Sequence, residues 1–166
     1  MLSGKAHIEE SAMRKAYLNL ARLIALLIVV QAMSITFAVA GLFNWITEKG
    51  GAVNSSVVEG WEDHPPTFTG AVGHAVHSLS GENVIPIVAL LLLIVSFFAK
   101  VPKGVAMASV IFVLVILQVY SGVKGDEMPY LGLWHGLGAL LIFGAAIGAA
   151  MAAKAAPAPV VTSPAE

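Results

Sequence analysis

The sequence predicts an all-α fold: an integral membrane, antiparallel four-helix bundle with both termini in the cytoplasm. Hydrophobic residues make up 58% of the 166 residues and charged residues only 11%, a balance outside the range of soluble globular domains. Four apolar stretches are each long enough to cross a bilayer as a helix. These stretches make the lipid bilayer the expected partner. A net charge of −1 without a basic cluster argues against a nucleic-acid partner.

The chain contains no cysteine. This excludes disulfides, thiolate-bound iron–sulfur clusters and covalently attached c-type haem, and it leaves histidine as the strongest metal ligand. No Ser/His/Asp arrangement, phosphate-binding loop or pair of carboxylates stands out, so the protein is not expected to be an enzyme on its own.

Polar and apolar segments alternate along the chain. Residues 1–19 are polar and mixed in charge, and we expect a cytoplasmic segment with a surface helix leading into the first span. A polar loop follows that span, with Trp45 and Trp61 at its two ends, which fits the enrichment of tryptophan at the membrane–water interface. Pro65 and Pro66 suit the start of the next helix. The expected spans are about 20–43, 69–99, 105–123 and 130–153, within a bundle of residues 20–154 that precedes a disordered tail at 155–166.

Basic residues predict the orientation of the spans. Only Lys49 and Lys124 fall on one side of a four-span arrangement, where they lie among acidic residues. The other side carries Lys5, Arg14, Lys15, Arg22, Lys100, Lys103 and Lys154. Because cytoplasmic loops carry an excess of Lys and Arg, both termini are expected to be cytoplasmic.

The fourth span contains glycines at a spacing that lets helices approach closely. Gly132 and Gly136, and then Gly144 and Gly148, are four residues apart. We expect these glycines to serve close packing within the bundle.

The second span has an unusual load of polar residues. Its purely apolar part, residues 84–99, is shorter than the ~20 residues that a helical span needs, so the span must include the polar residues before it. That places His74, His77 and Glu82 at or inside one membrane face, and Pro86 can kink the helix beyond them. Ionisable groups at such depth are costly and indicate a functional site.

Each of the four spans contributes one strong polar group outside its cytoplasmic third. At ~1.5 Å per residue, His135 lies about 28 Å from Lys154 and His77 about 34 Å from Lys100, near the outer boundary of a ~30 Å core. Gln118 falls in the outer half of the third span, and Gln31 falls near the middle of the first.

Histidines at matched depth on the second and fourth spans can ligate a haem iron from opposite sides. Imidazole suits iron, and bundle cores hold cofactors between facing helices. His77, which lies nearer the core than His74 and has a glycine four residues later, is the preferred partner of His135. Gln31 and Gln118 would then bind a haem propionate, a quinone carbonyl or each other.

Two other interpretations stay open. His74, His77, His135 and Glu82 offer three nitrogens and an oxygen for zinc, although Glu82 falls on a different helical face. Alternatively the histidines are amphipathic interfacial side chains and the glutamines join helices, in a structural or accessory subunit without a cofactor.

The chain resembles a group of small four-span bacterial membrane proteins of no assigned function. The resemblance covers residues 23–154 and rests on VVQAMSITFAVAGLF, on the His77–Gly81 spacing, and on LQVYSG and LWHGLGALLIFG. It implies the four-span fold and a bacterial plasma membrane, and it implies no activity.

More distantly, the chain is similar to one half of haem A synthase. Each four-helix half of that family places a haem-ligating histidine on its second and fourth helices near the outer face, which implies His77 and His135 here. This chain has no second half, and Glu82 follows the histidine where that family has a glutamate before it. The resemblance therefore implies haem binding rather than haem modification.

These observations lead to the hypothesis of one b-type haem held by His77 and His135, acting in electron transfer or haem handling. A single haem at one face cannot carry electrons across the membrane. We therefore expect either a larger membrane or redox complex or exchange with a quinone. A transporter using Glu82 is disfavoured, because the cytoplasmic halves of all four spans are apolar.

Overall fold

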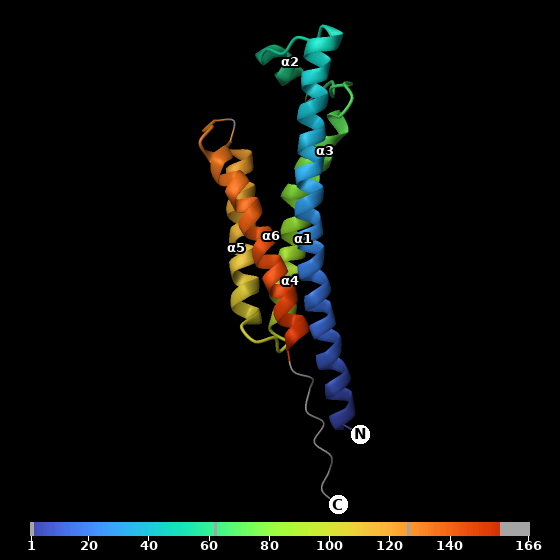
Figure 1. The fold of residues 1–166 in the computed structure, drawn as a ribbon, viewed down its shortest axis with the longest axis vertical. Helices are drawn as coiled ribbons and strands as arrows, with labels where there is room; N and C mark the ends of the chain where they lie inside the picture. Colours follow the sequence, from blue (N-terminus) through green and yellow to red (C-terminus); the bar gives the residue numbers. More distant parts are fainter. Residues whose placement is uncertain (1, 62, 126, 157–166) are drawn as a thin grey trace, which may run out of the picture. The chain divides into compact units, whose positions relative to one another are not determined.

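The computed structural model describes residues 2–61, 63–125 and 127–156, and for residues 2–8 only the backbone. In this part the chain is all-α (Figure 1). Its elements are α1 (Leu2–Lys49), α2 (Ser55–Gly60), α3 (Ala71–Leu79), the π-helical turn η1 (Ser80–Val84), α4 (Ile85–Ser96), α5 (Gly104–Val123) and α6 (Leu131–Ala155). Four stretches are long and apolar enough to cross a membrane: Glu9–Lys49, Ala71–Ser96, Gly104–Val123 and Leu131–Ala155. The predicted all-α fold with four long apolar helices is confirmed.

Large apolar side chains cover much of the outside of these helices. Leu140 is 71% exposed, Leu26 60% and Phe97 64%, and many other leucines, valines and isoleucines are similarly exposed. Exposure of so much apolar surface to water is unfavourable, whereas contact of that surface with lipid hydrocarbon is not. Helices can lie in lipid because they satisfy their own backbone hydrogen bonds. The chain is an integral membrane protein.

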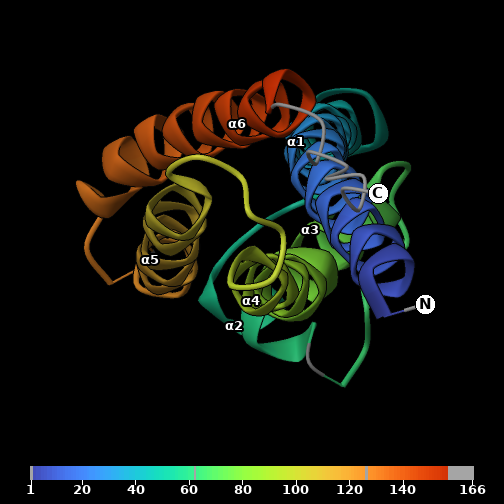
Figure 2. The same cartoon turned by 90° about the horizontal axis from the view of Figure 1, so that it is seen from below.

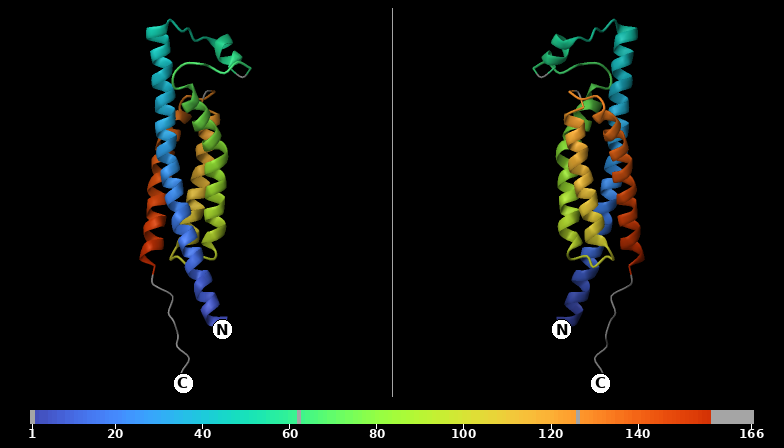
Figure 3. Two further views of the ribbon diagram at one scale, coloured as in Figure 1. Left: turned by 90° about the vertical axis from the view of Figure 1, so that its right-hand side faces the viewer. Right: turned by 90° about the vertical axis from the view of Figure 1, so that its left-hand side faces the viewer.

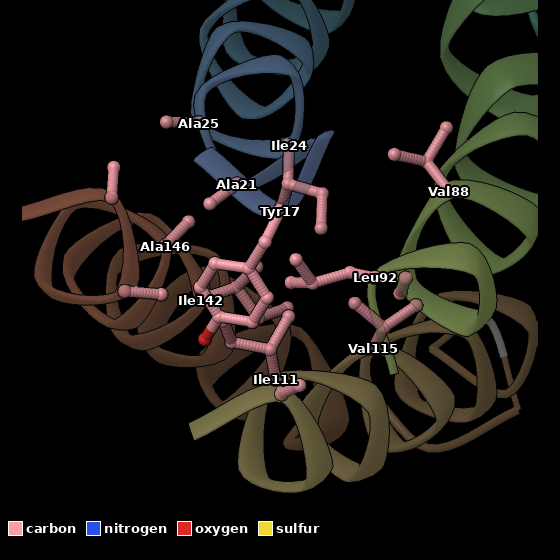
Figure 4. Packing of buried hydrophobic residues seen from close by; sticks show 14 of the residues in the cluster. Tyr17, Ala21, Ile24, Ala25, Val88, Leu92, Ile111, Val115, Ile142 and Ala146 are labelled. Atoms are coloured by element: carbon pink, nitrogen blue, oxygen red, sulfur yellow. The ribbon is translucent and has the colours of Figure 1, made fainter. Parts of the chain in front are cut away.

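The chain divides into two compact units. The first unit contains α1 up to Ile28 and the chain from Val84 onward. Its four helices, α1, α4, α5 and α6, surround one apolar core (Figure 2). Consecutive helices run in opposite directions (Figure 3). The largest fully buried side chains of this core are Tyr17, Ile24, Leu92, Ile111, Ile142 and Val115 (Figure 4).

Small side chains let the helices of the first unit pack closely. Ala21, Ala89, Ala108 and Ala146 are fully buried. Figure 4 shows Ala21 and Ala146 among the larger residues of the core. In lipid, such packing is favoured by van der Waals contact rather than by exclusion of water. The Tyr17 hydroxyl donates to the carbonyl oxygen of Gly104 at 3.1 Å, so its buried polar atom is satisfied.

The second unit contains residues 29–83: the remainder of α1, the helix α2, and α3 running antiparallel to α1 (Figure 3). Glycines bring α3 against α1 at backbone distance. A Cβ built on Gly73 would lie 2.3 Å from the carbonyl oxygen of Ser34. One built on Gly70, which has φ +101, would lie 2.5 Å from that of Phe37.

The helix bounds differ from the expected spans in three places. The expected surface segment is continuous with the first span in α1, and Tyr17 is already in the core, so packing begins before residue 20. The expected loop contains α2, because the Asn54 side chain accepts from the Val57 amide at 3.0 Å and caps a helix. Pro65 and Pro66 lie before α3 rather than in its first turn. The expected disordered tail lies outside the described residues, apart from 155 and 156.

The π-helical turn η1 interrupts the second span just before Pro86. Proline lacks an amide hydrogen, and its ring collides with the carbonyl four residues earlier, here that of Glu82 inside the turn. The wider π turn accommodates this residue. The kink expected at Pro86 is thus a π turn over residues 80–84, and such turns are frequent at functional sites.

Candidate functional site

His77 of α3 is fixed against α1 within the second unit. Its Nδ1 lies 3.1 Å from the backbone carbonyl oxygen of Gln31. The Gln31 side chain is buried, and its Nε2 donates to the hydroxyl of Ser80, which donates in turn to the carbonyl of Val76. The half-buried imidazole is therefore hydrogen-bonded to the backbone of α1, and the Gln31 side chain binds Ser80 in the turn that follows His77.

His135 of α6 is fixed against α5 within the first unit. Its Nδ1 lies 3.1 Å from the backbone carbonyl oxygen of Gln118 and 3.4 Å from the hydroxyl of Ser121. In return, Gln118 Nε2 donates to the backbone carbonyl of His135 at 2.8 Å. Gly122 leaves room for the ring, since a Cβ there would lie 2.9 Å from its Cε1 atom. Each side chain of the pair therefore contacts the other's backbone.

The carbonyl partner determines which imidazole nitrogen carries the proton. A backbone carbonyl oxygen only accepts hydrogen bonds, so Nδ1 must be the donor in both His77 and His135. In a neutral imidazole, the lone pair is then on Nε2. This tautomer is the one in which metal-binding histidines commonly ligate through Nε2, with Nδ1–H held by a carbonyl or carboxylate.

Both glutamine carbonyls also accept from a serine three residues later in the same helix. Ser34 Oγ donates to the Gln31 carbonyl at 3.0 Å, and Ser121 Oγ donates to the Gln118 carbonyl at 2.9 Å. Each unit thus contains the same arrangement, in which one carbonyl oxygen binds a serine hydroxyl and an imidazole Nδ1–H from the antiparallel neighbour. The repeated Gln-x-x-Ser spacing is visible in the sequence.

A glycine follows each histidine and lies beside the glutamine side chain. A Cβ on Gly81 would be 3.3 Å from Gln31 Oε1, and one on Gly138 would be 2.2 Å from Gln118 Oε1. Gln118 Oε1 is buried and has no hydrogen-bond partner in the described structure. The absence of a side chain at Gly138 therefore leaves the space that this oxygen occupies.

The other candidate residues lie apart from these pairs. His74 is exposed, and its ring makes no hydrogen bond to the described residues, while Glu82 is exposed on η1. Across the described ranges, no three His, Cys, Asp or Glu side chains are grouped so as to hold a metal ion. That finding gives the zinc interpretation no support. The structure brings Gln31 to His77 and Gln118 to His135, in separate units.

The glycines expected to pack the fourth span are not in close contacts. A Cβ on Gly132, Gly136 or Gly144 would meet no atom within 4 Å, and one on Gly148 would meet only Met107 Cε at 3.4 Å. The expectation of close packing through these glycines is wrong. The glycines whose Cβ would collide with the backbone of a neighbouring segment are instead Gly41, Gly70 and Gly73 of the second unit.

The geometry of the two histidine–glutamine pairs is the basis for a functional assignment. No family model, curated protein or solved structure matches this chain. The comparisons therefore identify no family, and the function must be argued from the residues themselves.

Sequence reasoning selected the four polar side chains of the pairs but not the contacts between them. It expected the glutamine side chains to bind a haem propionate, a quinone carbonyl or each other, or to join helices. Their side chains bind Ser80 and the His135 carbonyl, and their backbone carbonyls contact the imidazoles. It did not select Ser34 or Ser121, although the spacing of Gln31-Ala-Met-Ser34 repeats in Gln118-Val-Tyr-Ser121. That internal repeat is the signal that could have found them.

Proposed function

We propose that this protein binds one b-type haem through His77 and His135 and acts in electron transfer or haem handling. The observation that carries the proposal is the shared environment of the two imidazoles. Each holds Nδ1 at 3.1 Å from a glutamine backbone carbonyl of a neighbouring helix. The same hydrogen bond at both positions leaves each histidine in the tautomer that ligates a metal through Nε2.

The chain's residues fit the group. Nδ1–H donation to a carbonyl orients an imidazole and raises the basicity of Nε2, the atom that bonds to iron. Neither imidazole is fully buried, and Gly136 beside His135 leaves the adjoining surface without a side chain. When bound, a bis-histidine b-type haem supplies a one-electron redox centre. His74 and Glu82, being exposed, are available to a propionate or to water.

The positions of the histidines along their helices support a common depth. His77 precedes Ser96, the last residue of α4, by nineteen residues, and His135 precedes Lys154 in the last turn of α6 by nineteen. At ~1.5 Å per residue, each lies about 28 Å from that end of its span. Equal depth on two spans is a requirement for two axial ligands.

The proposal includes an orientation: a multi-pass protein of the bacterial plasma membrane with both termini in the cytoplasm and the histidines near the outer face. Seven of nine basic residues on one side support it. Because one haem at that face cannot carry electrons through the membrane, a larger membrane or redox complex or a quinone completes the role. The competing function is a structural or accessory subunit without a cofactor. In such a protein the contacts of His77 and His135 with neighbouring helices would stabilise the helix packing.

The decisive experiment is a visible absorption spectrum of the detergent-purified protein, first oxidised and then reduced with dithionite. A Soret band, with α and β bands that sharpen on reduction, is the expected result for a six-coordinate b-type haem. A protein that stays colourless after expression with added haem would remove the proposal and leave the structural role.

The two serines should tune the haem through the carbonyls that they share with the histidines. Two donors on one oxygen weaken each other, so Ser34→Ala and Ser121→Ala should strengthen the Nδ1–H bond and make the imidazole a stronger electron donor. We expect both variants to lower the reduction potential measured by redox titration. Thr36→Ala is the matched control, because the Thr36 hydroxyl donates to the Ala32 carbonyl, which binds no histidine. An equal shift in all three variants would argue against the mechanism.

The orientation has a direct test, because the chain has no native cysteine. A single cysteine placed at Lys124 should react in intact cells with a maleimide that does not cross the membrane. One placed at Lys103 should react only after the cells are opened. The reverse pattern would place the histidines near the cytoplasmic face.

A further inference from the structure

The second unit contains a pocket that the histidine–glutamine pairs do not use. It has a volume of about 490 Å³ and is built entirely from residues 45–68, between the end of α1 and the start of α3. This volume is within the ~300–1,000 Å³ range of pockets that hold small molecules. The residues that matter for recognition are Trp45, Lys49, Trp61, His64, Thr67 and Phe68.

Aromatic rings form one wall of the pocket. The rings of Trp45 and Phe68 are stacked, with centroids 5.9 Å apart and an angle of 24° between their planes. Trp61 lies against Phe68 with centroids 6.2 Å apart. Planar rings prefer offset-stacked or edge-to-face neighbours, so this cluster offers a surface on which a further planar ring packs well.

Two glycines let the chain close around the cluster. Gly50, with φ +69, ends α1 in a left-handed conformation, which suits glycine. A Cβ on Gly51 would lie 2.3 Å from the Trp45 ring, so only glycine lets the backbone lie against that ring. The Gly51 amide also donates to the Trp45 carbonyl at 3.0 Å. The pocket wall is therefore built by the chain turning back on Trp45.

Hydrogen-bond donors complete the lining. Lys49 lines the pocket and forms no salt bridge with a described carboxylate, so its three N–H donors are available for a ligand oxygen. Thr67 and His64 add a hydroxyl and an imidazole. Trp45 is only two residues beyond Phe43, the end of the apolar stretch of α1, so the pocket adjoins the membrane surface.

We propose that this pocket binds the head group of a membrane quinone. Such a ligand combines a planar ring for the aromatic wall with carbonyl oxygens for Lys49, and its apolar tail stays in the adjoining lipid. A redox role for the bound quinone rests on the proposed haem, but its binding does not. The quinone site is thus placed in residues 45–68 rather than at Gln31 and Gln118.

The test uses the fluorescence of Trp45 and Trp61. The chain has three tryptophans, so a Trp134→Phe variant reports only on the pocket. Decylubiquinone, a short-tailed quinone, is titrated into this variant in detergent and should quench its fluorescence saturably. Lys49→Gln, which removes the charge from the hydrogen-bond donor, should weaken binding by roughly tenfold or more, and Phe68→Ala should weaken it too. Lys124→Gln, a change in a different loop, should leave binding unchanged.

A second protein, with Trp45→Phe and Trp61→Phe, keeps only Trp134 and measures quenching by quinone dissolved in the detergent. Equal, non-saturating quenching in both proteins would overturn the proposal. Saturable quenching that Lys49→Gln and Phe68→Ala leave unchanged would also overturn it, because the site would then lie elsewhere. The titration is repeated with His77→Ala added, which should not alter quinone affinity. The measured quinone affinity therefore tests the pocket independently of whether the protein binds haem.

Discussion

Replacing either His77 or His135 with alanine is expected to remove the proposed haem from the purified protein, whereas His74→Ala should retain it. Each of these imidazoles would supply a bond to the haem iron, and neither histidine has a described alternative beside it. His74 is exposed and makes no hydrogen bond to the described residues that orients its ring. The measurement is the haem content per protein, from the reduced pyridine haemochrome spectrum. His74→Ala is a matched control, because it removes the same side chain from the same helix.

Loss of haem in these variants should not come from unfolding. An interhelical hydrogen bond in a membrane contributes on average about 0.6 kcal/mol and at most about 1.7 kcal/mol, so removing one of the imidazole–carbonyl bonds leaves the fold intact. Circular dichroism of both alanine variants should show unchanged helix content. Haem added together with free imidazole to either variant should restore the six-coordinate spectrum, because the imidazole occupies the vacated position.

The structural interpretation predicts a different outcome. If the histidines only join helices, the wild-type protein is colourless and both alanine variants differ from it only by a slightly lower melting temperature. Haem retained at the wild-type level in His135→Ala would likewise exclude that residue as a ligand, even in a coloured protein.

The sequence predicted the four long apolar helices, because hydrophobic length is a local property that the bilayer imposes directly. It also selected Gln31, His77, Gln118 and His135, because strong polar groups in apolar spans are costly and few. It could not predict that the backbone carbonyls of the glutamines hold the imidazoles, since that contact depends on the register between two helices. His74 and His77 differ by three residues, and only the packed structure separates an exposed ring from an anchored one.

Glycine spacing illustrates the same limit. The four-residue spacing in α6 predicted close packing, but Gly132 and Gly144 have open space where a side chain would be. Gly73 has no such spacing partner in its helix, yet it lies against the backbone of α1. The spacing of glycines shows that they share one face of a helix. Whether that face packs against another helix depends on the position of the neighbouring helix, which the spacing does not give. The pocket near Trp45 was missed for a related reason, since α2 and the turn at Gly50 fold a stretch that composition marks as loop.

Gly73→Ala is expected to be the most damaging single methyl addition to the histidine–glutamine pair of the second unit. The new Cβ would lie 2.3 Å from the carbonyl oxygen of Ser34 and 3.2 Å from the amide nitrogen of Ala38. Both are backbone atoms of α1, so no side-chain rotation relieves the collision and α3 must move away. Overpacking of this kind costs about 1–3 kcal/mol.

The displacement should reach the proposed haem ligand. His77 follows Gly73 by four residues, about one helical turn, so the same movement lengthens its 3.1 Å contact with the Gln31 carbonyl. We expect a lower melting temperature in detergent together with a lower haem content. Gly138→Ala should cost less, because its Cβ would meet the end of the Gln118 side chain, which can rotate.

Gly144→Ala is the matched control for this prediction. It adds the same methyl group inside a helix where no atom lies within 4 Å, and alanine favours the helix over glycine by about 0.5–1 kcal/mol. Its melting temperature should be unchanged or slightly higher, with full haem content. If Gly73→Ala and Gly144→Ala behave alike, then the close approach of α3 to α1 does not hold His77 in place, and the carbonyl contact cannot be what prepares that histidine for a metal.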